Sequence, residues 1–313
     1  MTAGYRFPHD LFTQAPRRAS LTTSMANLAG TPLAGQFGFE HASARRARPL
    51  HAARHWLRAL PRSVGMRRSA QSVFIDAKGV WSWAAGDALT PAARIDSMDD
   101  WFARHPGTNL AIWTSAQLLH NLDCDATTSL IDDAAFDRHV RRQLLNQHGD
   151  CSRHWPTATW RTRSGRGACA LAGLDLPAVW RQAQRHDVRV QSIIPWWYHA
   201  YKTALQCVGS LRDAPNAAVC IVEAEQIAWI ACSNGAMTSI QQRVLETPTV
   251  AALAHEMNCL RSGNARKVEP TVVLGQGIED GANTQLLRAL VLGRLDGQQP
   301  PVWLRPDSHF ERC

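Results

Sequence analysis

The sequence predicts a fold of the α/β or α+β class with mixed sheets, and three observations lead to it. From residue 72 onward, short strand-like runs alternate with helical patterns, and glycine or proline closes most of them. The hydrophobic fraction of 45% and the charged fraction of 19% are ordinary for a globular protein. A chain of 313 residues is long enough for two domains, or for one bilobal fold with a tail.

The first predicted elements are a hairpin, a short helix and a stretch of extended chain. Residues 72–86 alternate in polarity and read as two strands joined at Lys78-Gly79. The helix begins at Ser97, a residue type that caps helix N-termini, and stops at the His-Pro-Gly of residues 105–107. Residues 109–125 follow as extended chain.

A longer helix is predicted over residues 132–149. Phe136, Val140 and Leu144 recur every four residues and so lie on one face. The acidic pair Asp132-Asp133 stands at the helix start, where the helix dipole favours negative charge and explains the pair without catalysis.

The next elements are a second hairpin, a helix and a strand. Gly165 and Gly167 supply the turn between the two alternating runs of residues 157–173. Pro177 is suited to the first turn of the helix that follows, because its missing N–H would have no partner there. Residues 188–194 then form a strand.

Pro195 ends that strand, and the aromatic run Trp196-Trp197-Tyr198 opens another helix. Tyr201, Ala204 and Val208 continue one apolar stripe at helical spacing. A stacking platform for bases or sugars would use such aromatics, but their spacing favours packing in the core.

The last elements are three strands and a helix. Two strands fit residues 217–226 and 227–237, a helix fits residues 249–263, and residues 270–277 form a late buried strand that ends in a glycine turn. The element order is therefore hairpin, helix, strand, helix, hairpin, helix, strand, helix, hairpin, helix, strand.

In this order the chain resembles the actin-like assembly proteins of type IV pili, the PilM family, and the cytoplasmic domain of the type II secretion L protein, the GspL family. The resemblance covers roughly residues 72–310. Its best local passage is residues 167–205 (GACALAGLDLPAVWRQAQRHDVRVQSIIPWWYHAYKTAL), which resembles the family's inserted subdomain. Residues 268–281 (VEPTVVLGQGIEDG) are similar to the adenosine loop of the actin superfamily.

The resemblance implies an actin-like (ribonuclease H-like) bilobal fold. Residues 1–70 would be a basic leader, residues 71–210 a first lobe with an inserted subdomain, and residues 211–313 a second lobe. It also implies a groove that receives the cytoplasmic tail of a membrane-anchored pilus or secretion platform protein, and contact with a secretion ATPase. The expected location is cytoplasmic and peripheral to the inner membrane.

Nucleotide binding in this superfamily needs two phosphate hairpins, each with an aspartate and then a glycine two residues on, so that backbone N–H groups can cradle the phosphates. The first hairpin here has Asp76 and Gly79, so its spacing is off by one. The second has Glu223 and Glu225 and lacks glycine. Two carboxylates facing a triphosphate would each cost on the order of 1 kcal/mol in water, and several times more in a shielded cleft.

We therefore predict a non-catalytic scaffold with no catalytic residues and no cofactor. Gly275 and Gly277 are the candidate cofactor-binding residues, as the remains of an adenosine loop; the alternative is a plain strand-ending turn. A dinucleotide fingerprint would need a glycine where Asp280 stands. Because a Mg²⁺ bridge would invert the repulsion, an active actin-superfamily ATPase or a sugar-kinase-like enzyme stays as an alternative.

The net charge of +8 belongs to the leader. Residues 1–70 carry 11 arginines against Asp10 and Glu40, whereas residues 71–313 carry 23 basic and 24 acidic residues. The leader is rich in small and polar residues and is predicted to be mostly disordered, without the apolar region of a secretory signal. The candidate contacts with an anionic membrane surface or a partner are Arg45, Arg46, Arg48, Arg54 and Arg58. A nucleic-acid-binding leader is the third hypothesis.

The spacing of the cysteines and histidines does not predict a metal site. The eight cysteines form no C-x-x-C pair and are expected as reduced thiols, with Cys169, Cys220 and Cys232 in the core. Residues 148–154 (HGDCSRH) have ligand-like spacing, but zinc needs four ligands, so an exposed polar loop is predicted.

Overall fold

The computed structural model describes residues 70–83, 92–124, 132–161, 166–262 and 268–298. All of them belong to one compact unit of the chain, which excludes residues 13–67. The predicted leader contacts at Arg45, Arg46, Arg48, Arg54 and Arg58 therefore lie outside the described residues, as does the predicted turn at Gly165.

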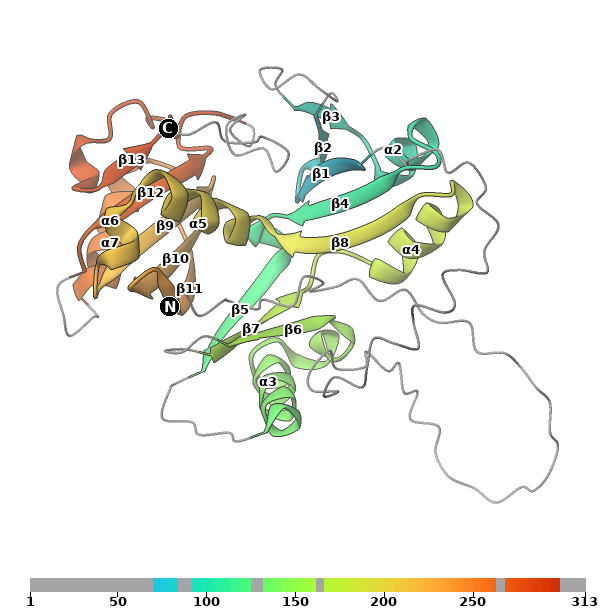
Figure 1. The fold of residues 1–313 in the computed structure, drawn as a ribbon, viewed down its shortest axis with the longest axis horizontal. Helices are drawn as coiled ribbons and strands as arrows, with labels where there is room; N and C mark the ends of the chain where they lie inside the picture. The colour runs from blue at the N-terminus through green and yellow to red at the C-terminus, as the bar shows by residue number, and fades with distance from the viewer. Residues whose placement is uncertain (1–69, 84–91, 125–131, 162–165, 263–267, 299–313) are drawn as a thin grey trace, which may run out of the picture. The chain divides into compact units, whose positions relative to one another are not determined.

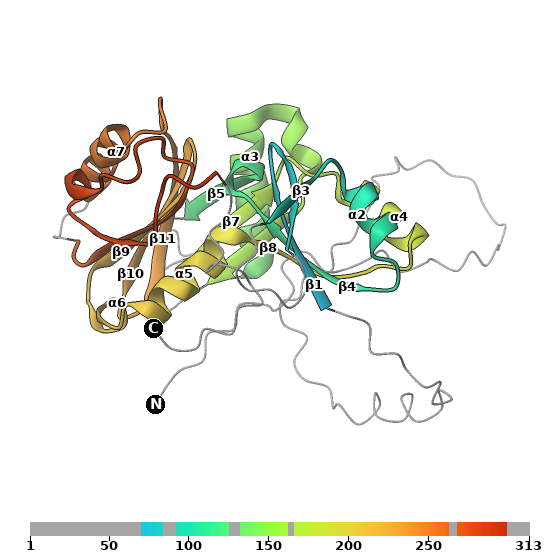
Figure 2. The same cartoon turned by 90° about the horizontal axis from the view of Figure 1, so that it is seen from above.

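The first sheet is mixed and has five strands in the order β3-β2-β1-β4-β8 (Figure 1). Neighbours β1, β2 and β3 run antiparallel, whereas β4 runs parallel to both β1 and β8. The strands are β1 (Ala70–Asp76), β2 (Gly79–Ser82), β3 (Ala93–Ile95), β4 (Asn109–Thr114) and β8 (Arg189–Pro195). Helices α2 (Met98–Arg104) and α4 (Leu176–Arg185) contact each other beside this sheet (Figure 2).

The second sheet has the same design, in the order β11-β10-β9-β12-β13. Again the first three strands in sequence form an antiparallel meander, and the next two run parallel. The strands are β9 (Ala217–Glu223), β10 (Gln226–Ser233), β11 (Ala236–Val244), β12 (Thr271–Gln276) and β13 (Leu290–Leu292), with η3 (Gln285–Leu287) before β13. The strand order of the first sheet is thus repeated, as a bilobal fold of two similar halves requires.

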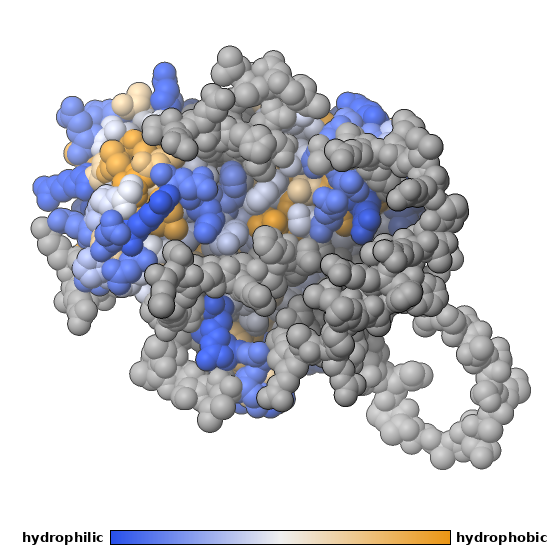
Figure 3. All heavy atoms as spheres, in the orientation of Figure 1, coloured by the Kyte–Doolittle hydropathy of each residue, from blue (hydrophilic) through white to orange (hydrophobic). Residues whose placement is uncertain are grey.

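Both faces of the second sheet are covered by helices. Every residue of β9 is buried, and alternate residues enter different clusters. Val219 and Ile221 join the cluster that contains α5 (Trp196–Cys207) and α6 (Ser210–Asp213). Cys220 and Val222 join the cluster that contains α7 (Val250–Ser262). In the space-filling view, apolar surface gathers on the part of the molecule that carries β12 and β13 (Figure 3).

A third, smaller sheet is inserted between β4 and α4. It has the order β5-β7-β6 and is antiparallel. Its elements are η1 (Ala116–Leu118), β5 (Leu119–Cys124), α3 (Asp133–His148), η2 (Gly149–His154), β6 (Thr157–Arg161) and β7 (Arg166–Leu171). The predicted assignment of residues 167–205 to the inserted subdomain is wrong for most of that passage, because only β7 lies in this sheet, and β8 lies in the first sheet.

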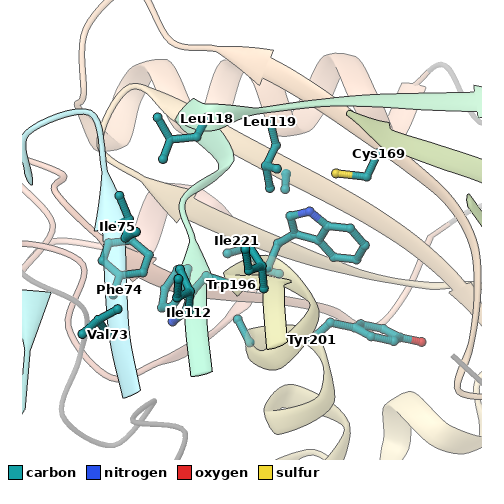
Figure 4. Close-up of a cluster of buried hydrophobic side chains, with 14 of the residues drawn as sticks. Val73, Phe74, Ile75, Ile112, Leu118, Leu119, Cys169, Trp196, Tyr201 and Ile221 are labelled. Carbon is teal, nitrogen blue, oxygen red and sulfur yellow. The ribbon is translucent and has the colours of Figure 1, made fainter. Parts of the chain in front are cut away.

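The core confirms the packing interpretation of the aromatic run. Trp196 and Trp197 are 0% and 1% exposed, and the Trp196 ring meets Phe74 of β1 edge to face at 5.6 Å between centroids. Trp196 lies in one cluster with residues of both five-stranded sheets, including Ile112 and Ile221 (Figure 4). The start of α5 therefore fills the space that joins the two sheets. The three cysteines predicted in the core, Cys169, Cys220 and Cys232, are buried as well.

Two predicted elements need correction. Residues 227–237 do not form a single strand, because Asn234 and Gly235, with φ of 50° and 69°, reverse the chain into β11. Positive φ at both central residues is what a two-residue hairpin turn requires, and Asn-Gly is its usual sequence. The extended chain of residues 109–125 is two strands in different sheets, separated by η1. Strand β3 was not predicted.

We expect Trp196→Ala to lower the free energy of unfolding by about 3–5 kcal/mol, because it opens a cavity where both sheets meet. Urea unfolding followed by circular dichroism measures this change. Leu290→Ala is the control, since Leu290 is 50% exposed and should cost far less. A loss below about 1 kcal/mol at Trp196 would contradict the shared core.

Candidate functional site

The candidate site lies where equivalent strands of the two large sheets end. Strand β1 ends at Asp76 and β9 ends at Glu223, so these two carboxylates hold the same position in the repeated topology. The parallel neighbours β4 and β12 end beside them, and the chain continues into Ser115 and Gly277. One small hollow joins these ends, and its lining residues are Asp76, Lys78, Ser115, Gln117, Glu223, Ala224, Gln276, Gly277 and Gln298.

In the first of the two predicted phosphate hairpins, formed by β1 and β2, Asp76 accepts the hydrogen bonds of the turn. Oδ1 of Asp76 accepts hydrogen bonds from the backbone N–H groups of Lys78 and Gly79 at 2.8 and 2.9 Å. Oδ2 accepts one from the indole N–H of Trp81 at 2.9 Å. The N–H of Ala77 donates to Oε1 of Gln117 at 3.3 Å. The turn's N–H groups thus point to acceptors within the protein.

In the second of the two predicted phosphate hairpins, formed by β9 and β10, the carboxylate of Glu223 reaches across to the first sheet. Glu223 is 2% exposed, and its two carboxylate oxygens lie 3.1 and 3.0 Å from the backbone nitrogen of Ala116, which donates to them. The Ser115 hydroxyl also hydrogen-bonds to this carboxylate. Burial raises the pKa of Glu223 to about 7, and the charge of Asp76 adds to the rise, although both hydrogen bonds oppose it. This carboxylate therefore ties the second sheet to the turn after β4.

The prediction that two glutamates of this hairpin face the cleft is wrong for Glu225. Glu225 is exposed and does not line the hollow. The hairpin has a two-residue turn, since Glu223 pairs with Gln226, and Ala224 takes the positive φ of 54°. Strand alternation would place residues 223 and 225 on the same face, but β9 ends at Glu223, and Glu225 belongs to the turn, where its side chain is exposed.

Gly275 and Gly277 are required by close packing against this second hairpin. A Cβ atom on Gly275, whose φ is 141°, would lie 2.0 Å from the carbonyl oxygen of Val222. A Cβ atom on Gly277, whose φ is 84°, would lie 2.7 Å from the Cα of Ala224. The structure therefore supplies a packing reason for both glycines, and their contact with an adenosine stays a prediction.

The hollow is far smaller than a nucleotide. Its volume is about 20 Å³, which is room for about one water molecule. Sites for small organic ligands usually measure about 300–1,000 Å³. Among the residues that the structure describes, side chains and hairpin backbone fill the region where a phosphate cradle would open.

Residues missed by the sequence analysis connect β11 of the second sheet to the inserted sheet. Gln242 donates from Nε2 to the carbonyl of Ala116 at 2.6 Å, and its Oε1 accepts from the side chain of Asn121 at 3.1 Å. Oδ1 of Asp123 accepts from the N–H of Ile240 at 2.8 Å, and burial raises the pKa of Asp123 to about 6. No motif marks these residues, since each is an isolated polar side chain whose partner is over 100 residues away.

Residues 148–154 form η2 and the end of α3 instead of an irregular loop. The His148 ring lies 4.1 Å from that of His120, which stacks on Trp155 at 4.8 Å. Cys151 is exposed and donates from Sγ to the carbonyl of His148. Within the described ranges, no group of three or more histidine, cysteine or acidic side chains is arranged to hold a metal ion.

The comparisons with known proteins give matches among solved structures. No family model matches the sequence, and neither does any curated protein. A Bacteroides thetaiotaomicron protein with an actin-like ATPase fold and unknown function is 7% identical, with a TM-score of 0.49 over 74% of this chain and 94% of that one. The PilM–PilN type IV pilus biogenesis complex gives 11% identity and a TM-score of 0.47, over 72% of this chain and 88% of that one.

A third similar structure is the cytoplasmic domain of EpsL, an inner membrane component of the type II secretion system of Vibrio cholerae. It is 8% identical, with a TM-score of 0.44 over 66% of this chain and 82% of that one. At such identities and TM-scores these similarities say nothing of function. The repeated strand order carries the conclusion on fold: the chain has a mixed α/β architecture with two five-stranded sheets of one design, as expected for an actin-like bilobal fold.

We expect Gly275→Ala to lower the free energy of unfolding by at least about 3 kcal/mol, because the added methyl group would collide with the backbone of Val222. Gly209→Ala is the matched control, since a Cβ atom there meets nothing within 4 Å. Urea unfolding of both variants tests the close approach. Equal stability of the two variants would show that the hairpin and β12 do not meet as described.

We expect Glu223→Gln to stabilise the protein at about pH 8, by up to about 3 kcal/mol, and to change little at about pH 5. A carboxylate whose pKa is raised on folding contributes stability below its unfolded pKa of 4.5, and that stability is lost as the pH rises through about 7. Glutamine can accept the same N–H bond without a buried charge. Thermal unfolding of both proteins across this pH range measures the difference, and parallel curves would mean that Glu223 is not buried as a carboxylate.

Proposed function

We propose that the chain is a non-catalytic, actin-like scaffold of a type IV pilus or type II secretion assembly platform. The observation that supports this proposal most is the closure of the candidate cleft by the protein's own hydrogen bonds. Glu223 of the second sheet bonds to the N–H of Ala116, which follows β4 of the first sheet. On this proposal the Glu223 carboxylate occupies the position that a phosphate would need.

The backbone donors of both hairpins add to this argument. A phosphate cradle depends on N–H groups that point into the site and have no other acceptor. Here Lys78 and Gly79 donate to Asp76, and Ala224 donates to the carbonyl of Gln276 at 2.9 Å. A phosphate would have to displace these bonds while facing two carboxylates, so binding would gain little and lose much.

The choice of machinery follows the resemblance in element order over residues 72–310. On this proposal the protein binds the cytoplasmic tail of a membrane-anchored platform protein, lies at the cytoplasmic face of the inner membrane and contacts a secretion ATPase. No helix in the described ranges is long and apolar enough to cross a membrane. On this proposal, attachment to the membrane comes from the partner, or from attraction of Arg45, Arg46, Arg48, Arg54 and Arg58 to anionic lipid.

One observation favours a second candidate, an active ATPase or sugar-kinase-like enzyme. Asp76 and Glu223 end equivalent strands and line the same hollow. Two carboxylates on opposite sides of a cleft are suitable ligands for Mg²⁺, which would reverse their repulsion of a phosphate. This reading requires the Glu223–Ala116 bond to break, because the closed hollow admits about one water.

Two measurements separate the candidates. Titration calorimetry of the full chain with ATP and Mg²⁺ should give no binding heat for the scaffold, whereas saturable binding would favour the enzyme. Fractionation of cells should place the protein with the membrane, and deletion of the genes for the platform proteins should release it. A protein found wholly free in the cytosol of intact cells would contradict the scaffold.

A further inference from the structure

A second hollow, much larger than the first, lies on the inserted subdomain. Its volume is about 310 Å³, within the range of sites that accept organic ligands. Most of its surface is apolar. It lies away from the candidate cleft, and its lining residues are Arg141, Arg142, Leu144, Leu145, Ser152, Arg153 and Thr157.

The corner between α3 and η2 builds this hollow. Gly149 ends α3 with a φ of 70°, and its N–H donates to the carbonyl of Leu145. The positive φ turns the chain back, so that η2 packs against α3. The hydroxyl of Ser152 then donates to the carbonyl of Gly149 at 2.8 Å, which fixes the short helix. Arg153 of η2 thereby lines the same hollow as the α3 arginines.

The charged residues that line the hollow are all positively charged. Three of its seven residues are arginines, and none of the seven is acidic. Arg141 pairs with Asp137 at 3.1 Å and Arg153 with Asp150 at 2.9 Å, but both arginine side chains are about half exposed or more. The Arg153–Asp150 pair is exposed on both sides and contributes little, so that guanidinium group can turn to a ligand at small cost. The Asp137 side chain is only 17% exposed, so the Arg141 pair is partly buried.

We propose that this hollow binds an acidic peptide segment of a partner protein, with one apolar side chain on the leucine floor and carboxylates on the arginines. Guanidinium groups form strong paired hydrogen bonds with carboxylates. Clusters of arginines are a recurring means of recognising acidic motifs. Leu144 is buried and Leu145 half-buried, so the floor suits a single aliphatic or aromatic side chain.

The shape and chemistry of the lining favour a peptide over two other anionic ligands. A lipid headgroup layer is flat, whereas the arginines here line a hollow. A nucleic-acid strand is usually held by aromatic rings that stack on its bases, and the lining residues include no aromatic ring. The proposal does not depend on whether the cleft binds a nucleotide.

Fluorescence anisotropy with short labelled peptides tests this proposal. The probes are Glu-Glu-X-Glu-Glu peptides in which X is leucine, phenylalanine, serine or lysine, added to the full chain. We expect saturable binding when X is apolar, and binding at least about tenfold weaker when X is serine or lysine. Arg142→Glu should weaken the leucine peptide by at least about tenfold, and so should Leu145→Asp.

Two controls address the other basic parts of the chain. Arg185→Glu, on the exposed side of α4, reverses one charge elsewhere and should leave binding unchanged. Replacing Arg45, Arg46, Arg48, Arg54 and Arg58 with glutamine should also leave it unchanged. Melting curves of the variants report that they are folded.

Three results would overturn the proposal: no binding of any peptide at about 1 mM, equal loss with Arg142→Glu and Arg185→Glu, or loss only with the leader variant. Sedimentation of the protein with phosphatidylglycerol vesicles tests separately whether the hollow binds a membrane surface. Vesicle binding that depends on Arg142, without peptide binding, would assign the hollow to a membrane surface instead.

Discussion

The hydrogen bond between the Glu223 carboxylate and the Ala116 N–H is the interaction on which the closed arrangement of the two sheets depends. It crosses from the last residue of β9 to the turn after β4, and so joins the two large sheets at the ends of equivalent strands. The Glu223 side chain is almost wholly buried, which makes its charge costly and raises its pKa to about 7. The Glu223 side chain that connects the two sheets therefore also occupies part of the space between the ends of their strands.

Around this bond, neighbouring contacts hold the two halves in the same arrangement. Gln242 bonds to the carbonyl of Ala116, so both the N–H and the C=O of that residue are held by the second sheet. Trp196 fills the core on the side of α5. The close approach of β12 to the second hairpin, which excludes any side chain at Gly275, sets the position of the last strand before the hollow. Local packing and long-range hydrogen bonds together therefore keep the cleft closed.

Much of the fold could be predicted from the sequence because local patterns report local structure. The period of Phe136, Val140 and Leu144 marked α3, and all three are buried. Ser97 marked the start of α2, and its side chain accepts the N–H of Asp100. The site was harder to predict. Glu223 was identified as incompatible with phosphate, but its partner Ala116 lies 107 residues earlier and has no distinctive side chain. The roles of Asp123 and Gln242 depend on the same kind of distant pairing.

The cleft is held closed by the protein's own hydrogen bonds. Amide hydrogen exchange of the full chain, with and without ATP and Mg²⁺, tests this closure most directly, because a protected N–H must open before it exchanges. We expect the amides of Lys78, Gly79 and Ala116 to be protected in the free protein and unchanged by the nucleotide. Rapid exchange at Ala116 in the free protein, or protection that changes when ATP is added, would contradict a closed and non-catalytic cleft.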